Sequence, residues 1–238
     1  MPLAGEAKVR LTSPWTSAPT DTASLLSVAS RRGLVAAAGP DQIIIATTES
    51  VRKAFASAKE GDSEVRSFEP QLRIPAPTRI SHLAFTADEK YLIMSAESGG
   101  GLAVYDVQSL VQGSTNSAFE LPTNGESIRL LAPNPAVEKA ELCAVVTTNG
   151  NLCMANLNER KSSTPLRSQV SCLSWSARGK QLCAGMGDGT IYQITPEGQV
   201  KAEIPQPPNS GNLYGMSPKP FLLLSSMLLG CPAHIKLL

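Results

Sequence analysis

Between residues 170 and 194 the chain has the sequence VSCLSWSARGKQLCAGMGDGTIYQI, in which short apolar runs alternate with turn residues. Leu173 and Trp175 lie on a first predicted strand, and two further short strands follow it. Asp188 and Gly189 join the last two strands, because these residue types accept the positive φ of a tight hairpin. Short antiparallel strands joined by turns at this spacing are typical of one blade of a β-propeller.

A single blade cannot bury both faces of its sheet, so the pattern predicts further copies in the same chain. Comparable repeats begin near residues 23, 80, 128 and 170. In the second repeat, Leu83 and Phe85 take the places of Leu173 and Trp175. The predicted structural blade positions are Leu83, Phe85, Leu173, Trp175, Gly185, Asp188 and Gly189. We therefore expect an all-β, WD40-like propeller that is incomplete, with about four blades.

The repeats divide the chain into three predicted segments. Residues 1–22 form an N-terminal extension, residues 23–208 a partial propeller, and residues 209–238 a tail that abandons the pattern. The tail holds no acidic residue, and its apolar run at 221–229 is shorter than the about 20 residues that cross a bilayer. We interpret this aberrant tail as a shifted reading frame or a retained intron in the gene model, with an alternative C-terminus as the other explanation.

The balance of charge argues against two classes of partner. The chain has 21 Lys and Arg residues against 20 Asp and Glu residues, a formal net charge of +1. We therefore expect no direct binding to nucleic acid and none to a membrane. The first 22 residues contain no apolar core segment, which predicts an intracellular protein without a signal peptide. Five cysteines without a CxxC pair predict reduced, buried thiols, with a metal or redox role as the weaker alternative.

Residues of the types that carry catalysis are sparse. His82 lies on a predicted strand and is interpreted as structural, while Asp88 and Glu89 fall in a predicted turn. Gly99–Gly101 lack the helix and the Lys-Ser/Thr pair that would follow in a phosphate-binding loop, so they predict a hairpin. We expect no enzyme, no cofactor, no metal and no small-molecule substrate, and an enzyme is the least favoured of the three function classes considered.

Partner binding by a propeller is expected on its loops, because its strands fill the sheets. The longest predicted loop is Thr47–Thr78, in which Glu49–Glu60 predicts a short helix with Ser50 as its N-cap. This loop is either a docking element or a solvated insertion whose Phe55 packs locally, and the second interpretation is favoured. Residues 108–120 are rich in Ser, Gly, Asn and Gln, and they predict a flexible loop.

Three segments together carry a more specific resemblance. They are SLLSVASRRGLVAAAG, PQLRIPAPTRISHLAFTADEKYLIMSA and VSCLSWSARGKQLCAGMGDGTIYQITPEGQVKAEIPQPP. In this order, over residues 22–208, they are similar to the N-terminal propeller of the Nup159/Nup214 family of nucleoporins. The most diagnostic features are Leu25-Leu26 and Gly33-Leu34 in the first repeat, the apolar-proline lead-in to the second, and the WSARGKQLCAG blade.

The resemblance implies a fold, a location and a function. Members of this family sit at the nuclear pore complex, on the cytoplasmic face of the nuclear envelope, where the propeller docks a DEAD-box RNA helicase in mRNA export. The family propeller has about seven blades, its partners are the helicase and other nucleoporins, and catalysis belongs to the helicase. No contact residue is carried over, so the partner-binding residues stay unknown. The alternative function is a generic WD40-like scaffold or adaptor in another intracellular complex.

Overall fold

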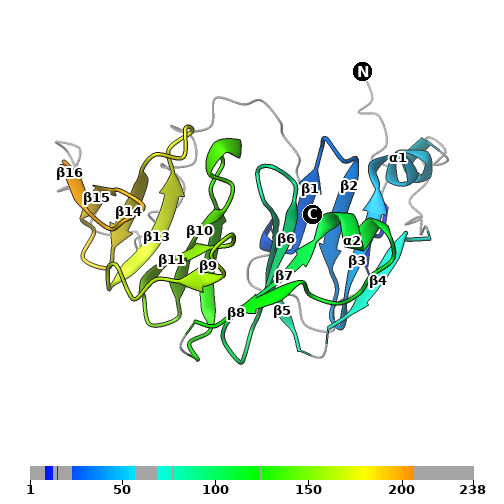
Figure 1. Cartoon of the computed structure of the whole chain (residues 1–238), viewed down its shortest axis with the longest axis horizontal. Coiled ribbons are helices and arrows are strands. Elements are labelled where there is room, and N and C mark those ends of the chain that lie inside the picture. Colours follow the sequence, from blue (N-terminus) through cyan, green and yellow to red (C-terminus); the bar gives the residue numbers. More distant parts are fainter. Residues whose placement is uncertain are drawn as a thin grey trace, which may run out of the picture. The chain divides into compact units, whose positions relative to one another are not determined.

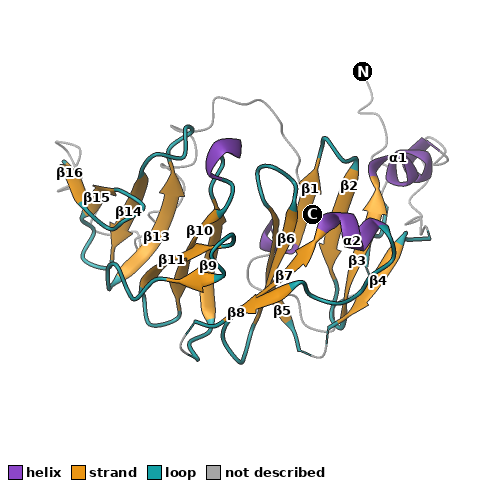
Figure 2. Cartoon of the chain, viewed as in Figure 1, coloured by secondary structure: helices purple, strands orange, loops and turns teal. Residues whose placement is uncertain are grey.

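The described residues of the chain form four separate antiparallel sheets (Figure 1). The computed structural model describes residues 9–12, 15, 23–56, 69–76, 78–123 and 125–205. Within these residues each sheet has four strands, and helices are few and short (Figure 2). The predicted all-β propeller class is confirmed, because one four-stranded antiparallel sheet is the structural unit of a blade.

The strands follow one another in chain order across each sheet, in the orders β1-β2-β3-β4, β5-β6-β7-β8, β12-β11-β10-β9 and β13-β14-β15-β16. The first two sheets contain β1 (Leu26–Ala29), β2 (Leu34–Ala38), β3 (Gln42–Thr47), β4 (Leu72–Pro75), β5 (Ile80–Phe85), β6 (Tyr91–Ala96), β7 (Leu102–Asp106) and β8 (Phe119–Leu121). The last two contain β9 (Ile128–Pro133), β10 (Leu142–Thr147), β11 (Leu152–Asn156), β12 (Lys161–Ser162), β13 (Val170–Trp175), β14 (Leu182–Met186), β15 (Ile191–Ile194) and β16 (Val200–Ile204).

Within the described residues, four short helical segments connect or precede strands. They are the 3-10 turns η1 (Ala23–Leu25) and η2 (Val137–Lys139) and the α-helices α1 (Thr48–Ala56) and α2 (Val107–Val111). In the part of the chain that the structure describes, no helix has the length and apolar character needed to cross a membrane.

The chain divides into two compact units. The N-terminal unit is Met1–Ile128 and holds the first two sheets, whereas the C-terminal unit is Arg129–Leu238 and holds the last two. The boundary falls at the first residue of β9. Each unit therefore contains one pair of neighbouring blades.

In the N-terminal unit, strands of both sheets contribute to a shared hydrophobic core. Its most buried large side chains are Ile43, Ile45, Ile74, Ile80 and Leu92, each at most 1% exposed. Strand β2 has the sequence LVAAA and is buried at all five positions. A strand that is covered on both faces needs no polar alternation, which explains this continuous run of small apolar residues.

The C-terminal unit has its own core, in which Trp175 joins the two sheets. The indole is 8% exposed, and its Nε1 donates a hydrogen bond to the backbone oxygen of Ala132 in β9 over 2.8 Å. Leu182 and Ile194 from the same sheet and Leu152 from the other are fully buried beside it. A buried indole N–H requires such a partner, so this bond fixes where β13 packs.

Two strands occur in segments that were predicted to be loops. Strand β4 lies within the predicted loop Thr47–Thr78 and pairs with β3, where Ile74 is 1% exposed. Strand β8 begins within residues 108–120 and pairs with β7. Both predictions were wrong, because a strand of three or four residues leaves almost no periodic signal and is fixed by its sheet neighbour.

The helix predictions need two further corrections. The N-cap of α1 is Thr47, whose Oγ1 accepts a hydrogen bond from the backbone N–H of Ser50 over 3.0 Å, so Ser50 is not the cap. The helix α2 also lies in the segment predicted as a flexible loop. It begins after Asp106, whose carboxylate accepts from the backbone N–H of Ser109 over 3.0 Å.

Some predicted features lie outside the described residues. These are residues 57–60 of the predicted helix, nearly all of the extension 1–22, and the tail 209–238. The division of the chain into segments 1–22, 23–208 and 209–238 therefore stays a prediction.

The role of Trp175 leads to a stability prediction. Replacement Trp175→Ala is expected to lower the free energy of unfolding by about 3–5 kcal/mol, because it removes the buried indole volume and takes the donor from the Ala132 carbonyl. The matched variant Trp175→Phe keeps most of the apolar contact and should lose less. Chemical denaturation followed by far-UV circular dichroism measures both, and a cost near zero for Trp175→Ala would show that the blade alignment is wrong.

Candidate functional site

The predicted blade positions lie within the sheets and the turns that join them. Leu83 and Phe85 are buried in the N-terminal core, whereas Trp175 is buried and Leu173 half-buried in the C-terminal core. At Gly185, an added Cβ would lie 2.4 Å from the Sγ of Cys172. Because these residues lie within the sheets, the surface available to a partner lies at the turns and at α1.

The turn between β14 and β15 contains the last two predicted positions. The Oδ1 of Asp188 accepts a hydrogen bond from the backbone N–H of Thr190 over 2.9 Å. This bond lowers the pKa of the exposed Asp188 carboxyl below its ordinary value. Gly189 has a φ of +89°, a conformation that glycine adopts without strain.

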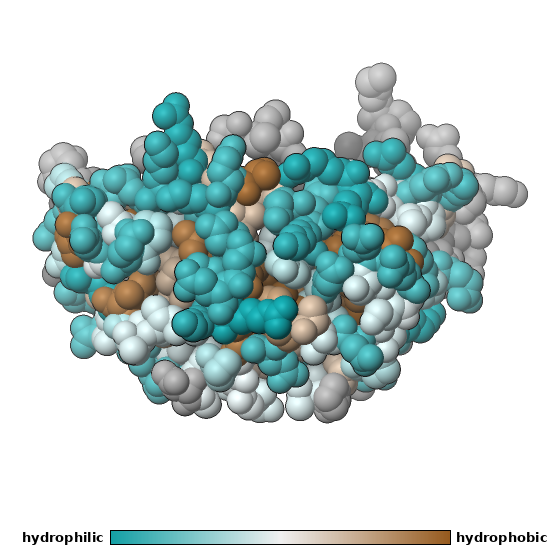
Figure 3. Space-filling view, viewed as in Figure 1, coloured by the Kyte–Doolittle hydropathy of each residue, from teal (hydrophilic) through white to brown (hydrophobic). Residues whose placement is uncertain are grey.

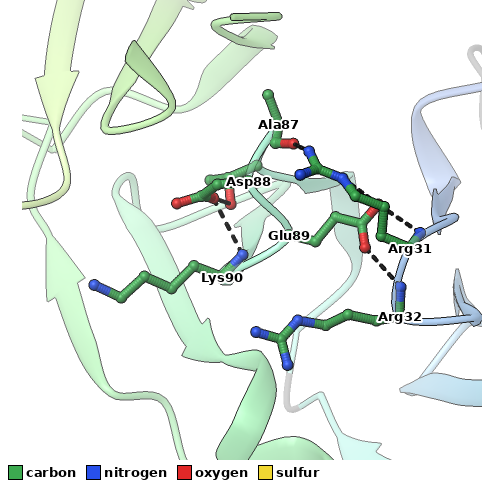
Figure 4. A network of polar contacts seen from close by, with 7 residues as sticks. Arg31, Arg32, Ala87, Asp88, Glu89 and Lys90 are labelled. Carbon is green, nitrogen blue, oxygen red and sulfur yellow. Dashed lines mark hydrogen bonds and ion pairs between the residues drawn. The ribbon is translucent and has the colours of Figure 1, made fainter. Parts of the chain in front are cut away.

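A buried carboxylate ties the first two sheets together at their turns (Figure 4). Glu89 lies between β5 and β6, and its side-chain oxygens accept hydrogen bonds from the backbone N–H groups of Arg31 and Arg32, over 2.9 and 2.8 Å. The Nε of Arg31 lies 3.9 Å from the same carboxylate. Because Glu89 is only 8% exposed, these charge-assisted bonds are poorly screened by solvent.

The backbone conformation of Glu89 is unusual for its residue type. Its φ is +59°, while Gly179, at the same place in the turn between β13 and β14, has a φ of +62°. A residue with a Cβ pays about 1–2 kcal/mol for this left-handed conformation. The two bonds to the backbone of Arg31 and Arg32 offset that cost. Sequence reasoning missed this role, although the aligned turns ADEK and ARGK carry the signal of a Glu in a glycine position.

The C-terminal unit uses a different side chain for the same purpose. Asn134 follows β9 and is fully buried. Its Nδ2 donates to the backbone oxygen of Gly179 over 2.9 Å, and its Oδ1 accepts from the backbone N–H of Ala136 over 2.9 Å. In each unit, therefore, one buried polar side chain joins the first turn of one blade to the first turn of the next.

Cationic side chains lie on the surface around the contact between Glu89 and the turn that joins β1 and β2. We define the turn surface as residues 30–33 and 87–90. Arg32 and Lys90 are exposed, and Figure 4 shows both side chains extending away from the Glu89 carboxylate. Arg31 is also largely exposed, and its guanidinium donates to the backbone oxygen of Ala87. Three cations, Arg31, Arg32 and Lys90, outnumber the carboxylates Asp88 and Glu89 here, so the turn surface can present a small net positive charge on a fixed backbone.

The helix α1 forms a second exposed element of the N-terminal unit. None of its described side chains is buried, and Phe55 is 44% exposed. Lys53 lies 2.7 Å from the carboxylate of Glu49, and this contact lowers the pKa of Glu49. The exposed Phe55 ring can contribute apolar contact area to a partner.

Among the described residues, an open hollow lies in the C-terminal unit and another in the N-terminal unit. The hollow in the C-terminal unit has a volume of about 610 Å³ and is lined by Arg129, Asn149, Gln169 and Asp188 with their neighbours. The Nη1 of Arg129 donates to the backbone oxygen of Ser171 over 2.8 Å, which holds the guanidinium against β13. The lining of this hollow mixes polar and apolar surface.

The hollow in the N-terminal unit is smaller, about 390 Å³, and more apolar. Met94, Tyr105, Leu121 and Pro122 line it together with the carboxylate of Glu120. Burial raises the pKa of the Tyr105 phenol, and the negative charge of Glu120 raises it further. Tyr105 therefore stays neutral at physiological pH.

His82 and Cys143 are of residue types that can carry catalysis, but both lie in contacts within the sheets. The Nδ1 of His82 lies 3.0 Å from the Oγ of Ser95 and 3.1 Å from the Oγ of Ser81. Burial raises the pKa of the Cys143 thiol to about 12, which keeps it protonated and unreactive. Among the described residues, no three His, Cys, Asp or Glu side chains gather in a way that could hold a metal ion.

Comparisons with known proteins agree with this architecture. The family model described as NUP159/214 beta propeller matches residues 19–228. Nucleoporin NUP159 of Chaetomium thermophilum is 65% identical over 217 residues, which cover 89% of this chain and 15% of that protein. Nuclear pore complex protein Nup214 of Homo sapiens is 29% identical over 215 residues, which cover 84% of this chain and 10% of that protein.

A solved structure shows the same fold. The crystal structure of the N-terminal domain of Nup159 matches with a TM-score of 0.58 and 15% identity, over 79% of this chain and 46% of that chain. At this identity the likeness concerns the fold alone. The chain spans 15% or less of the length of these two curated relatives. The family match also runs to residue 228, past residue 208, where the propeller segment was predicted to end.

The hydrogen bonds of Glu89 predict that replacing its carboxylate by an amide lowers the stability of the fold. Glu89→Gln is expected to cost about 1–3 kcal/mol of unfolding free energy, because the amide sets an N–H against one of the two backbone donors. The matched variant Glu97→Gln alters a carboxylate that pairs with Arg79 at 3.6 Å but is 62% exposed, and such surface pairs contribute about 1 kcal/mol or less. Urea denaturation of both variants measures the difference, and equal costs would contradict the role of Glu89.

The contact at Gly185 predicts a coupled pair of substitutions. Gly185→Ala should cost about 1–3 kcal/mol, because the new methyl group overlaps the Cys172 sulfur. The cost should shrink when the same change is made in a Cys172→Ala chain, which has no sulfur there.

Gly187→Ala is the control, because its new Cβ would meet only the Gln169 oxygen, at 3.8 Å. Thermal unfolding of the four variants tests this contact. A Gly185→Ala cost that is unchanged in the Cys172→Ala chain would refute it.

Proposed function

The chain belongs to the NUP159/214 β-propeller family, and on this premise we propose that it is a protein-interaction module of the nuclear pore complex. The proposed location is the cytoplasmic face of the nuclear envelope. The observation that carries the proposal is the family match over residues 19–228, together with 65% identity to a nucleoporin.

The proposed role of this module is in mRNA export, where it contributes to the docking of a DEAD-box RNA helicase. The helicase then performs the catalysis, and this chain supplies binding surface and position. The described geometry supports such a division of labour, because the strands are committed to the two cores while turns, α1 and the open hollows remain exposed. Loops on a rigid scaffold are where interaction sites are most often found.

The turn surface is the part of the N-terminal unit that we favour for electrostatic recognition. Arg32 and Lys90 extend from two turns that Glu89 holds together, so both cations are presented by an ordered backbone. Surface charges of this kind mainly raise the association rate and orient the partner. Other nucleoporins and the helicase are the proposed protein partners.

Localisation tests the first part of the proposal. A fluorescent tag on the native gene is expected to give a punctate nuclear rim, and immunogold labelling should place the tag on the cytoplasmic side of the pores. A tagged nucleoporin of the opposite face serves as the control for side. Diffuse cytoplasmic or nucleoplasmic signal would contradict the proposal.

Binding tests the second part. The purified chain, immobilised by one end, is expected to retain the DEAD-box helicase of mRNA export and not an unrelated DEAD-box helicase from the same cells. Binding should weaken as salt is raised if the turn surface steers it. Retention of neither helicase, with a different complex recovered by affinity purification from cells, would favour the adaptor alternative.

A further inference from the structure

Two Thr-Pro steps occur among the described residues, and their surroundings are opposite. Thr164-Pro165 lies between β12 and β13, and both residues are exposed. The Thr164 hydroxyl has no hydrogen-bond partner within the described part of the chain, and the neighbouring Ser163 hydroxyl donates to the backbone oxygen of Thr164 over 2.8 Å. The Thr164 side chain is therefore open to an enzyme that approaches from solvent.

In the second step, Thr195-Pro196, the threonine hydroxyl is already engaged in hydrogen bonds. The Thr195 hydroxyl oxygen lies 3.3 Å from the backbone N–H of Gln199. The Glu197 carboxylate also hydrogen-bonds the Thr195 side chain, and this contact lowers the pKa of Glu197. Pro196 itself is buried. A second anion at Thr195 would face the Glu197 carboxylate, so this hydroxyl is both occupied and electrostatically unsuited to phosphorylation.

We propose that Thr164 is a phosphorylation site for a proline-directed protein kinase. Such an enzyme reads a proline directly after the acceptor, and Pro165 is exposed for that contact. Proline also restricts Thr164 to extended conformations, the form in which a substrate enters a kinase cleft. The proposal is independent of helicase docking and of the location of the protein.

The chemical step is an ordinary phosphoryl transfer from ATP. The Thr164 Oγ attacks the γ-phosphorus, the bond from that phosphorus to the bridging oxygen of ADP breaks, and ADP leaves. The hydroxyl proton passes to the catalytic carboxylate of the kinase. No group of this chain takes part in the transfer beyond the acceptor hydroxyl.

Arg167, three residues after Thr164 in the chain, is the partner that we propose for the new charge. Its guanidinium carbon lies 4.3 Å from the centroid of the Tyr192 ring, and its Nε is buried without a hydrogen-bond partner. The backbone of this segment is fixed, because Leu166 N–H donates to the oxygen of Leu152 over 2.8 Å and Leu152 N–H donates to the oxygen of Arg167 over 2.7 Å. The backbone of Arg167 is therefore held in place beside Leu152 of β11.

A phosphothreonine at position 164 would add negative charge and hydrogen-bond acceptors next to this segment. It carries a charge of about −1.5 to −2 and three strong acceptor oxygens. Arginine binds phosphate through charge-assisted bonds that are often bidentate. The phosphate would give the Arg167 guanidinium an acceptor and fasten the connection between β12 and β13 to the sheet that contains Tyr192. Phosphorylation is thus expected to stabilise the C-terminal unit.

The first experiment measures where the folded chain is phosphorylated. The 238-residue chain is incubated with ATP and a cyclin-dependent kinase, after Ser13 and Ser217, whose Ser-Pro steps lie outside the described residues, are changed to Ala. Peptide mass spectrometry is expected to find phosphate on Thr164 and none on Thr195. Thr164→Ala should abolish incorporation, and Thr195→Ala should leave it unchanged. Absence of phosphate from Thr164, or equal modification of Thr195, would overturn the proposal.

The second experiment tests the partner of the phosphate. The melting temperature of the chain is expected to rise on phosphorylation, and this rise should vanish in Arg167→Gln and be partly kept in Arg167→Lys. Phosphorus NMR provides a readout that does not depend on folding stability, because pairing with Arg167 should lower the second pKa of the phosphate below its usual value of about 6. The same phosphate pKa in the parent and Arg167→Gln chains would refute the role of Arg167.

Discussion

The structure depends on one constraint, which is that a four-stranded sheet has two faces and can shield neither by itself. In the N-terminal unit the first sheet meets this constraint on one face by packing against the second, and Leu34, Ala36 and Ala38 of β2 lie in the shared core. The C-terminal unit repeats the solution with Trp175 bonded to β9. Once the strands are committed to these cores, the surface available for interaction is what the turns, the inserted helix and the hollows provide.

Apolar packing brings the sheets together, but buried polar side chains fix their turns. Glu89 and Asn134 perform this task in the two units with different chemistry, a carboxylate accepting two backbone N–H groups and an amide donating to a carbonyl. Each bond is directional and has a buried side chain at one end, so a shift of one turn would leave that buried side chain unpaired. The cations of the turn surface thereby gain a fixed backbone, which supports their use in recognition.

The exposed face shown in Figure 3 is mostly hydrophilic, with hydrophobic areas between the polar ones. Isolated apolar residues on a surface are ordinary. The edge strand β16 is exposed at every residue, including Val200 and Ile204, and Lys201 and Glu203 alternate with them. Charges on an edge strand oppose unwanted pairing with another chain. The face in Figure 3 thus combines polar surface with limited apolar area.

The sequence by itself determined the blade repeats, the placement of most strands and the family, because alternating apolar residues and turn types are local signals. Phe85 and Trp175 were predicted as blade positions, and the structure places both in cores. Tertiary structure alone decided β4 and β8, since such short strands form only against a neighbour already in place. It also gave Glu89 its role, because the N–H groups that the carboxylate binds lie 57 and 58 residues away in the sequence. No local pattern encodes a contact across that distance.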